Sequence, residues 1–532
     1  MKFKTDLIKR VGLCILIILF VYSPGAFAQT KRAVSIVDVA VLTLSESPLI
    51  QRNKLTVNIS EGNFRIQRSA FDYRLSTSAF ATRNSLNLLS VDPRNSLTDG
   101  TLNTQGSIFS LGVSKRFRTG LTTDLSVNYN SLNDNFSLNR FNEAFMPNIT
   151  DHFMSSSLTL TQPLMRGRGT IIATALEQSA TLNLQSSRKN LTFINSVQIL
   201  DATTAYWQYV AAFNEALIFR QNESRVRRML EITQELVNGD KRAKGDLAQV
   251  RADLANQERL NSVARQNLIS ARFNLGRAIG LSEIDSEKIG EPMDAFPVLD
   301  KAGNIDQLSL DYLKELAHQN REDIAANELS QKALELQMRL ADNDRKPQVD
   351  LLGVLNYGGT QIGNGFSETI NTFTSSQGRD LGFQVGLRFD FPVNNNRAQG
   401  AYTQSKALLR DQEIQTANLT RNIDINVAIA LNNLKNAVDI LQYAKKSLTY
   451  NEEVYKNEQT KFQNGLTTLL NLILFQERLT VSQVEYLRAQ QQFALAIVSL
   501  RFETGTLYAY DNSDTGAMTF TPDTFYTIPS PN

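Results

Sequence analysis

The stretch KFQNGLTTLLNLILFQERL (Lys461–Leu479) interrupts a regular heptad pattern at Asn464-Gly465 and then resumes it. Apolar residues recur at every seventh position over 427–462 and again over 472–500. This spacing is typical of helices that pack as coiled coils. Because Asn and Gly tolerate the left-handed backbone that ends a helix, the stretch predicts two antiparallel helices joined by a tight turn.

A second break of the same kind lies 226 residues earlier, in ELVNGDKRAKGDLAQVRADL (Glu235–Leu254). The helix that follows it carries a row of small residues, Ala264, Ala271 and Ala278. Small residues let helices approach closely, so each helix is expected to pack against two neighbours. At about 1.5 Å per residue, the helix predicted over 400–464 is on the order of 100 Å long, and the first copy matches it.

Other paired landmarks extend this similarity into an internal repeat. SESPLIQ (45–51) pairs with QNREDIA (319–325) at an offset of about 275 residues, and LTLTQPLMRGRG (158–169) pairs with LRFDFPVNNNRAQG (387–400) at an offset of 229. The two offsets differ by about 45 residues. The difference predicts an insertion in the first copy between roughly residues 85 and 150.

Strand patterns accompany the helical ones. Apolar and polar residues alternate over 381–391, and the insertion shows the same alternation over 106–130, on both sides of Thr119-Gly120. The second pattern predicts an amphipathic hairpin. One apolar and one polar face suit a transmembrane β-barrel, and also a soluble sheet with one face on a core. Whether the hairpin adds barrel strands or forms an extracellular loop stays open at this point.

The first thirty residues have the layout of a secretory signal peptide. Basic residues precede an apolar run of 12 residues over 11–22, and Ala26-Phe27-Ala28 provides a cleavage site after Ala28. The run is too short for a membrane-spanning helix, which needs roughly 20 residues. The only cysteine, Cys14, lies inside this segment. The predicted mature chain therefore has no thiol for disulfides or metal binding.

Charge and histidine content argue against several classes of function. The chain has 55 basic and 53 acidic residues, and four of the basic residues lie in the predicted signal, so the rest is near neutral and a nucleic-acid partner gains no support. The two histidines, His152 and His318, fall in different copies without neighbouring acidic clusters. No catalytic, cofactor or metal site is predicted, and His318 is expected at the surface.

A few strands per chain cannot close a barrel, and an open sheet edge is not viable in lipid. Two repeats with two strands each give four, so three chains are expected to supply twelve strands around a lumen. The expected fold class is an α+β membrane protein with two internal structural repeats. It combines a trimeric outer-membrane β-barrel with a long antiparallel α-helical coiled-coil tunnel in the periplasm.

In this order and at these offsets, SPLI, REDI, LTQPLMRGRG, FDFPVNNNRAQG and FQNGLTTLLNLILFQERL resemble the TolC-type outer-membrane efflux proteins, over about residues 33–510. The resemblance implies a homotrimeric channel in outer-membrane lipid with its helical part in the periplasm. It also implies partners: a periplasmic adaptor (membrane fusion) protein and an inner-membrane RND or ABC transporter. The role would be multidrug or solute efflux or type I secretion, with the substrate and pump class left open.

The expected organisation has five parts: a signal peptide over 1–28, a first repeat over 29–281, an equatorial linker over 282–311, a second repeat over 312–506 and a polar C-terminal tail over 507–532. The first repeat contains the inserted hairpin and a helical tip near 238–246, and the second has its tip near 464–471. The resemblance implies that the linker and the tail form a collar around the helical tube. The tail is expected to be partly disordered.

The resemblance further implies that the helical tips dock on the adaptor and close the tube at rest. The candidate residues are Asn238, Gly239, Asp240, Lys241 and Asp246 at the first tip, and Asn464, Gly465, Leu466, Thr467, Thr468 and Asn471 at the second. Aspartates that are common at the second tip in the family are replaced here by Asn471 and Leu474, so no acidic ring is expected from this copy. An ordinary solvated helix turn is the competing interpretation of the charges at the first tip.

Two other functions compete with a channel. A periplasmic or surface coiled-coil structural protein or adhesin would use the strands as a soluble sheet, and membrane residence discriminates it from a channel. An exported hydrolase is disfavoured because the sequence offers no recognisable catalytic groups.

Overall fold

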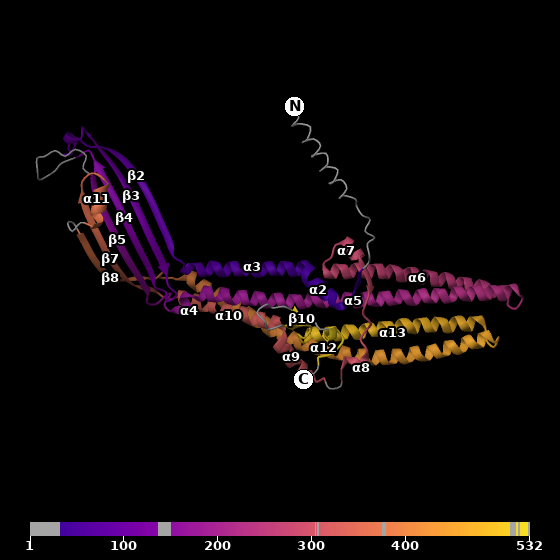
Figure 1. Ribbon diagram of the computed structural model, residues 1–532. Helices are drawn as coiled ribbons and strands as arrows, with labels where there is room; N and C mark the ends of the chain where they lie inside the picture. The colour runs from indigo at the N-terminus through magenta and orange to yellow at the C-terminus, as the bar shows by residue number, and fades with distance from the viewer. Residues whose placement is uncertain are drawn as a thin grey trace, which may run out of the picture. The chain divides into compact units, whose positions relative to one another are not determined.

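The computed structural model describes residues 32–136, 150–303, 305, 308–374, 379–510, 518–519 and 522–529. The predicted signal peptide lies outside them. The chain divides into two compact units, and Figure 1 labels their elements. The helical unit comprises residues up to 54, 191–322 and from 419 onward, and the sheet unit comprises 55–190 and 323–418. No helix in the described ranges is long and apolar enough to cross a membrane.

The same order of elements occurs twice along the chain. The first copy contains α2 (Ile36–Glu46), α3 (Pro48–Arg68), β2 (Arg74–Asn87), β5 (Thr150–Pro163), α5 (Ala175–Asn238) and α6 (Lys244–Ile279). The second contains α9 (Leu310–Asn320), α10 (Glu322–Asp344), β7 (Gln348–Ile362), β8 (Arg379–Asp390), α12 (Asn396–Gln463) and α13 (Leu469–Glu503). The helix predicted over 400–464 is therefore α12, with 68 residues, and its counterpart α5 has 64.

Shorter elements connect these. Between the repeats lie α7 (Glu283–Glu287), β6 (Ile289–Pro292) and α8 (Leu299–Ala302). The N-terminal β1 (Arg32–Val34) pairs with β6 in a parallel two-stranded sheet. The remaining elements are η1 (Ser69–Phe71), η2 (Asn95–Leu97), α4 (Thr170–Ala173), α11 (Phe366–Thr374), β9 (Ala509–Tyr510), β10 (Met518–Thr519) and η4 (Pro522–Phe525).

The sheet unit is built on a six-stranded antiparallel sheet in the order β2-β3-β4-β5-β7-β8. Two of its four inner strands, β3 (Thr101–Arg116) and β4 (Thr122–Asp134), form the hairpin predicted over 106–130. The expectation of four strands per chain is therefore wrong, because the insertion pairs with β2 on one side and β5 on the other. Local alternation predicted these strands but could not indicate their place in the sheet.

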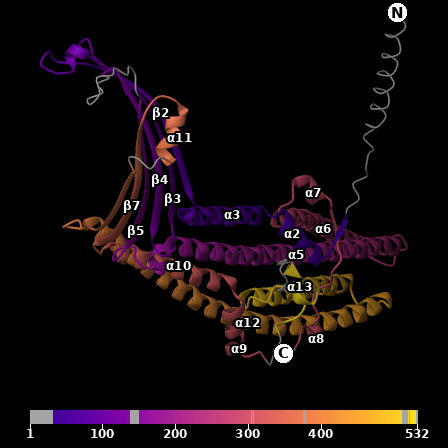
Figure 2. The ribbon, with the colours of Figure 1, turned by 60° about the vertical axis from the view of Figure 1, so that its left-hand side comes forward.

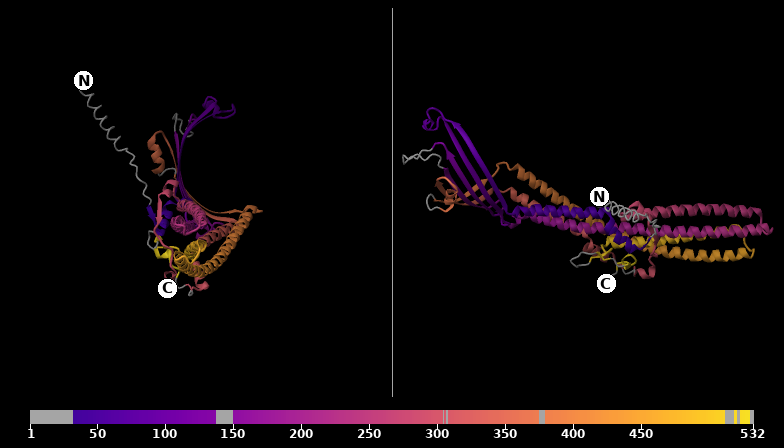
Figure 3. Two further views of the ribbon diagram at one scale, coloured as in Figure 1. Left: turned by 90° about the vertical axis from the view of Figure 1, so that its right-hand side faces the viewer. Right: turned by 45° about the horizontal axis from the view of Figure 1, so that its top comes forward.

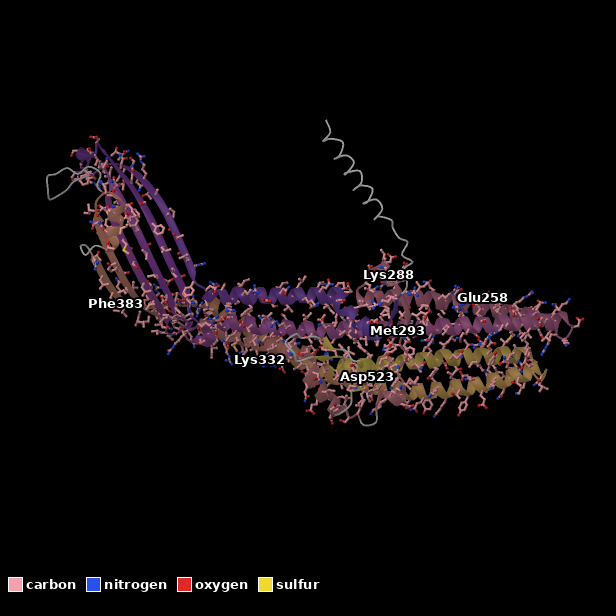
Figure 4. The ribbon with its side chains drawn as sticks, in the orientation of Figure 1. Glu258, Lys288, Met293, Lys332, Phe383 and Asp523 are labelled. Atoms are coloured by element: carbon pink, nitrogen blue, oxygen red, sulfur yellow. The ribbon has the colours of Figure 1, made fainter. Side chains whose placement is uncertain are left out.

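The two faces of the sheet differ in chemistry along its whole width. One register row runs across the six strands through Leu75, Val113, Leu125, Leu158, Leu355 and Phe383. The adjacent row, which points to the other face, is Ser76, Gly112, Ser126, Ser157, Asn356 and Gly382. Leu75 and Phe383 are 70% and 72% exposed in the single chain, and Figure 4 labels Phe383 on β8. An exposed apolar band requires a cover, since monomeric soluble proteins rarely leave one open.

The turn between β3 and β4 is fixed to the start of α5. Arg118 in this turn donates two hydrogen bonds to the Glu177 carboxylate, at 2.6 and 2.9 Å, and its guanidinium lies 4.9 Å from the ring centre of Phe71. Gly120 adopts a φ of +94°, and an added Cβ there would lie 2.9 Å from the carbonyl oxygen of Gly167. These contacts make the inserted hairpin an integral part of the sheet unit.

Acidification is expected to loosen this turn. The hydrogen bonds from Arg118 hold the pKa of Glu177 below its ordinary value of 4.5. Glu177 therefore stabilises the fold above that pH, and the contribution disappears as the pH falls through the lowered pKa. Amide hydrogen exchange over 117–121, corrected for intrinsic rates, should speed up from pH 7 to about pH 3. Glu177→Gln should already exchange fast at pH 7, and equal pH dependence in both proteins would contradict the assignment.

The segment after β7 forms a helix. The chain is rich in glycine near Gly358, yet β7 continues to Ile362 and α11 follows. This helix packs against β5 and β7, and Figures 2 and 3 show it alongside the sheet, on the convex side in the end-on view. His152 on β5 is buried here and lies 2.6 Å from the Tyr129 hydroxyl and 3.0 Å from the Gly363 carbonyl oxygen.

The helical unit has its core around Trp207. This fully buried side chain stacks on Phe296 from the linker at 5.3 Å and meets Tyr526 from the C-terminal tail edge-on at 5.8 Å. Phe525 is also fully buried, and Arg501 donates hydrogen bonds to the Thr527 and Ile528 carbonyl oxygens. Residues 522–529 of the tail are thus packed into the core of the helical unit.

The start of the second repeat is joined to the end of α13 by a buried ion pair. Arg321, in the REDI stretch, is 8% exposed and lies 2.7 Å from the Glu503 carboxylate, between the rings of Phe193 and Phe502. His318, three residues earlier, lies at the surface as expected and contacts Asp424 at 2.8 Å.

Candidate functional site at the helical tips

The first tip connects α5 to α6 through a left-handed helix cap. The amide of Lys241 donates to the Leu236 carbonyl and that of Asp240 donates to the Val237 carbonyl, which satisfies the last free carbonyls of α5. The residue with positive φ is Asp240 at +56°. The predicted turn is therefore present, but Asp240 adopts the left-handed conformation that was expected of Asn238-Gly239. Asp246 lies in the first turn of α6, 3.9 Å from Arg242.

The second tip uses the same cap and a stronger helix start. The amide of Leu466 donates to the Lys461 carbonyl, and Gly465 has a φ of +74°. Thr468 is the N-cap of α13, and its hydroxyl accepts from the Asn471 amide at 3.3 Å. The Thr467 hydroxyl donates to the Glu458 carboxylate, and this bond lowers the pKa of Glu458. Glu458 is therefore ionised at neutral pH.

The two tips are packed against one another. Val226 and Met229 of α5, Val250 of α6, and Leu469 and Leu472 of α13 form one buried apolar cluster. The Arg242 guanidinium of the first tip lies 5.0 Å from the ring centre of Phe462 at the end of α12. The four helix ends thus form a single end surface.

A buried polar layer crosses the helices below this cluster. Asn222 of α5 donates to the Gln257 side chain of α6 at 2.7 Å, and Gln476 of α13 donates to Asn222 at 2.9 Å. These three side chains are at most 6% exposed. Buried amides need partners, so this layer fixes how α5, α6 and α13 align along their axes.

Replacing Asn222 by alanine is expected to destabilise the helical unit by about 2–4 kcal/mol. The change removes the hydrogen-bond partner of the Gln257 Oε1 atom and that of the Gln476 Nε2 atom, and each loss costs roughly 1–3 kcal/mol. The urea dependence of proteolytic cleavage in the helices measures the effect. Gln459→Ala, at an exposed site on α12, is the matched control, and an equal shift in both variants would contradict the role given to this layer.

Most of the candidate residues lie on the exposed surface of the tips. Asn238, Gly239, Asp240, Lys241, Asn464, Gly465, Leu466, Thr468 and Asn471 are exposed, whereas Asp246 and Thr467 are half-buried. Leu466 is 76% and the neighbouring Leu470 58% exposed. Leu470 belongs to this surface, and the buried Glu458 and the half-buried Phe462 lie at the same tips. None of the three was predicted as a site residue. The seven-residue spacing indicated that Phe462 lies on the packed face of its helix. The contact between the Phe462 ring and the Arg242 guanidinium arises only in the tertiary structure.

No cluster of three or more histidine, cysteine or acidic side chains that could hold a metal ion occurs in the part of the chain that the structure describes.

Solved structures with this fold include outer-membrane channels. The chain is similar to the Campylobacter jejuni CmeC outer membrane channel, with a TM-score of 0.63 at 13% identity over 88% of this chain and 85% of that one. It is similar to the outer membrane protein VceC of Vibrio cholerae, with a TM-score of 0.60 at 14% identity over 88% and 96% of the two chains. It is also similar to the open state of the Neisseria gonorrhoeae MtrE outer membrane channel, with a TM-score of 0.60 at 14% identity over 91% of this chain and 93% of that one.

The α+β fold of these channels, with a sheet and long helical hairpins in two repeats, is therefore the fold of this chain, as predicted. A search of curated proteins finds no match. The family model for outer membrane efflux proteins matches residues 313–506. The second repeat is thus an outer membrane efflux protein domain, which confirms the resemblance to TolC-type proteins inferred from the sequence.

Proposed function

We propose that the chain forms a passive homotrimeric channel in the outer membrane, through which an inner-membrane RND or ABC transporter exports substrates by way of a periplasmic adaptor. The observation that carries the proposal is the exposed apolar row on a sheet with two open edges. Lipid tails solvate such an apolar row, and the edge strands of further copies of the chain pair with the two open edges of the sheet. The helical unit would then extend into the periplasm.

The end surface of the helices supports adaptor docking. Its exposed leucines, Leu466 and Leu470, provide apolar anchors at the second tip, and the exposed Asp240 and Lys241 provide charge at the first. Buried apolar anchors within a polar rim are the usual composition of a binding interface. The tip carboxylate Glu458 is held by Thr467, so the acidic ring missing at Asn471 is not replaced by a freely moving carboxylate.

A coiled-coil adhesin or scaffold is the alternative function. It predicts that the apolar row of the sheet is covered by protein in a soluble particle. The channel predicts that this row contacts lipid. The family match to efflux proteins over 313–506 favours the channel.

Site-specific photocrosslinking in intact cells tests the docking role. A photoreactive residue at Leu466 should link the protein to a periplasmic adaptor. The same residue at Tyr443, 68% exposed on α12, is the matched control and should give no such product. Adaptor linked equally from both positions, or from neither while export continues, would contradict docking at the tips.

A further inference from the structure

We propose that the outer-membrane wall of this channel has eighteen strands, six from each of three chains, and that it closes by pairing Asp390 of one copy with Arg74 of the next. The inference rests on the proposed trimer. It concerns a feature that the sequence-based count of twelve strands did not contain.

The inserted hairpin has the properties of a wall element. β3 pairs with β2 over fourteen consecutive positions, and β4 pairs with β5 over twelve. Its residues continue both the apolar and the polar row in phase with the flanking strands. Its turn is bound to α5 through Arg118 and Glu177. A hairpin folded outside the wall would share neither the register nor this anchor.

The two edges of the sheet are complementary to each other. Within the described residues, β2 and β8 are the outermost strands. Six strands alternate in direction, so β8 of one copy and β2 of the next run antiparallel when copies are placed side by side. The edge strands have similar lengths, with 14 residues in β2 and 12 in β8. A second copy of the chain therefore covers each edge with the pairing already used throughout the sheet.

The stagger of the sheet fixes the register of this junction. β3 and β4 end flush, with Arg116 opposite Thr122, and so do β7 and β8, with Gln348 opposite Asp390. At each of the other three pairings, the later strand in the sheet order extends two residues beyond its neighbour at the end of the sheet that adjoins the helices. Flush closure places Asp390 opposite Arg74 and Gly386 opposite Ser78 of the next copy.

Side-chain alternation excludes a slip of one residue, and charge disfavours a slip of two residues in one direction. A slip of one residue would put apolar side chains on the polar face. A slip of two residues in one direction would place Arg388 opposite Arg74, and like charges directly opposite are unfavourable. Flush pairing instead joins Asp390 and Arg74, which are both exposed in the single chain.

The resulting barrel has ordinary geometry and a wide bore. Its total stagger corresponds to a strand tilt of about 35°, at the lower end of the usual range. Because barrel diameter grows roughly linearly with strand number, the bore is about 1.5 times that of a twelve-stranded wall. A wall of this size leaves an open aqueous lumen, so the membrane section does not limit the size of the exported substrate.

Cysteine pairs in the full-length protein in outer membranes test the closure, and the native Cys14 lies in the predicted signal peptide. Gly386→Cys has open space for its side chain. Combined with Ser78→Cys, it should link chains covalently into trimers under mild oxidation. Gly386→Cys with Phe80→Cys, two residues out of register, should link poorly. Ser78→Cys combined with Ser110→Cys, which lie opposite each other within one chain, should form a disulfide inside the chain without joining chains. This disulfide would show that β3 pairs with β2 in the barrel wall.

A charge exchange provides a second readout. Asp390→Arg alone should lower the yield of trimers, and combining it with Arg74→Asp should restore them. Trimers that export normally but link neither at 386/78 nor at 78/110 would overturn the eighteen-stranded wall and leave the channel intact. Wild-type protein that neither trimerises nor exports would overturn the wall together with the proposed function.

Discussion

Insertion of three or four residues after Gly465 is expected to abolish pump-dependent export while trimers remain at the wild-type level. The insertion point lies outside both helices, since α12 ends at Gln463 and α13 begins at Leu469. Packing of Leu469 and Leu472 in the tip cluster is therefore retained. The exposed Leu466 moves away from its docking position, and loss of such an anchor costs about 2 kcal/mol or more.

That cost corresponds to an adaptor affinity lowered about thirtyfold or more, and the export rate is expected to fall with it. The rate of substrate extrusion from intact cells measures it, with trimer content determined on the same membranes. The same insertion after Val91, exposed in the β2–β3 connection, is the control and should be tolerated. Normal export by the Gly465 insertion variant would refute docking at this tip.

Arginine on the apolar face of β8 is expected to prevent insertion into the outer membrane, whereas arginine on the opposite face is expected to be tolerated. Val385 is 63% exposed in the single chain and lies between Phe383 and Leu387 on the apolar face. A lipid-facing arginine near the bilayer midplane costs about 2–4 kcal/mol in each chain, and a trimer accumulates three such costs. Val385→Arg should therefore strongly reduce the protein found in outer membranes.

The neighbouring substitution Gln384→Arg is the matched control. Gln384 lies on the polar face and is paired with Val354 across the strand, so its side chain is expected to face the water-filled lumen. Membrane fractionation of the two variants gives the comparison. Equal loss in both variants would show that β8 is merely intolerant of arginine, and equal retention would contradict a lipid-facing row.

Local patterns in the sequence predicted the long helices and their turns. The heptad ends at Asn464-Gly465, and α12 ends at Gln463. At the first tip the same dipeptide indicated the turn, yet Asp240 takes the left-handed conformation. The terminal hydrogen bonds of α5 decide that detail, and the dipeptide alone does not encode it.

Non-local pairing accounts for what the sequence did not reveal. The alternation over 106–130 indicated a hairpin, but its insertion between β2 and β5 depends on partners that are distant along the chain. The packing of Phe525 and Tyr526 on Trp207 is similar, because two aromatic residues in a polar tail produce no periodic signal. α11 follows a glycine-rich segment and has nine residues, too few for a clear helical pattern.

Native mass spectrometry of the protein extracted from outer membranes in mild detergent tests the central claim most directly. The account predicts a particle with the mass of three mature chains. A soluble monomer, absent from the membrane fraction, would contradict the channel and favour the coiled-coil scaffold.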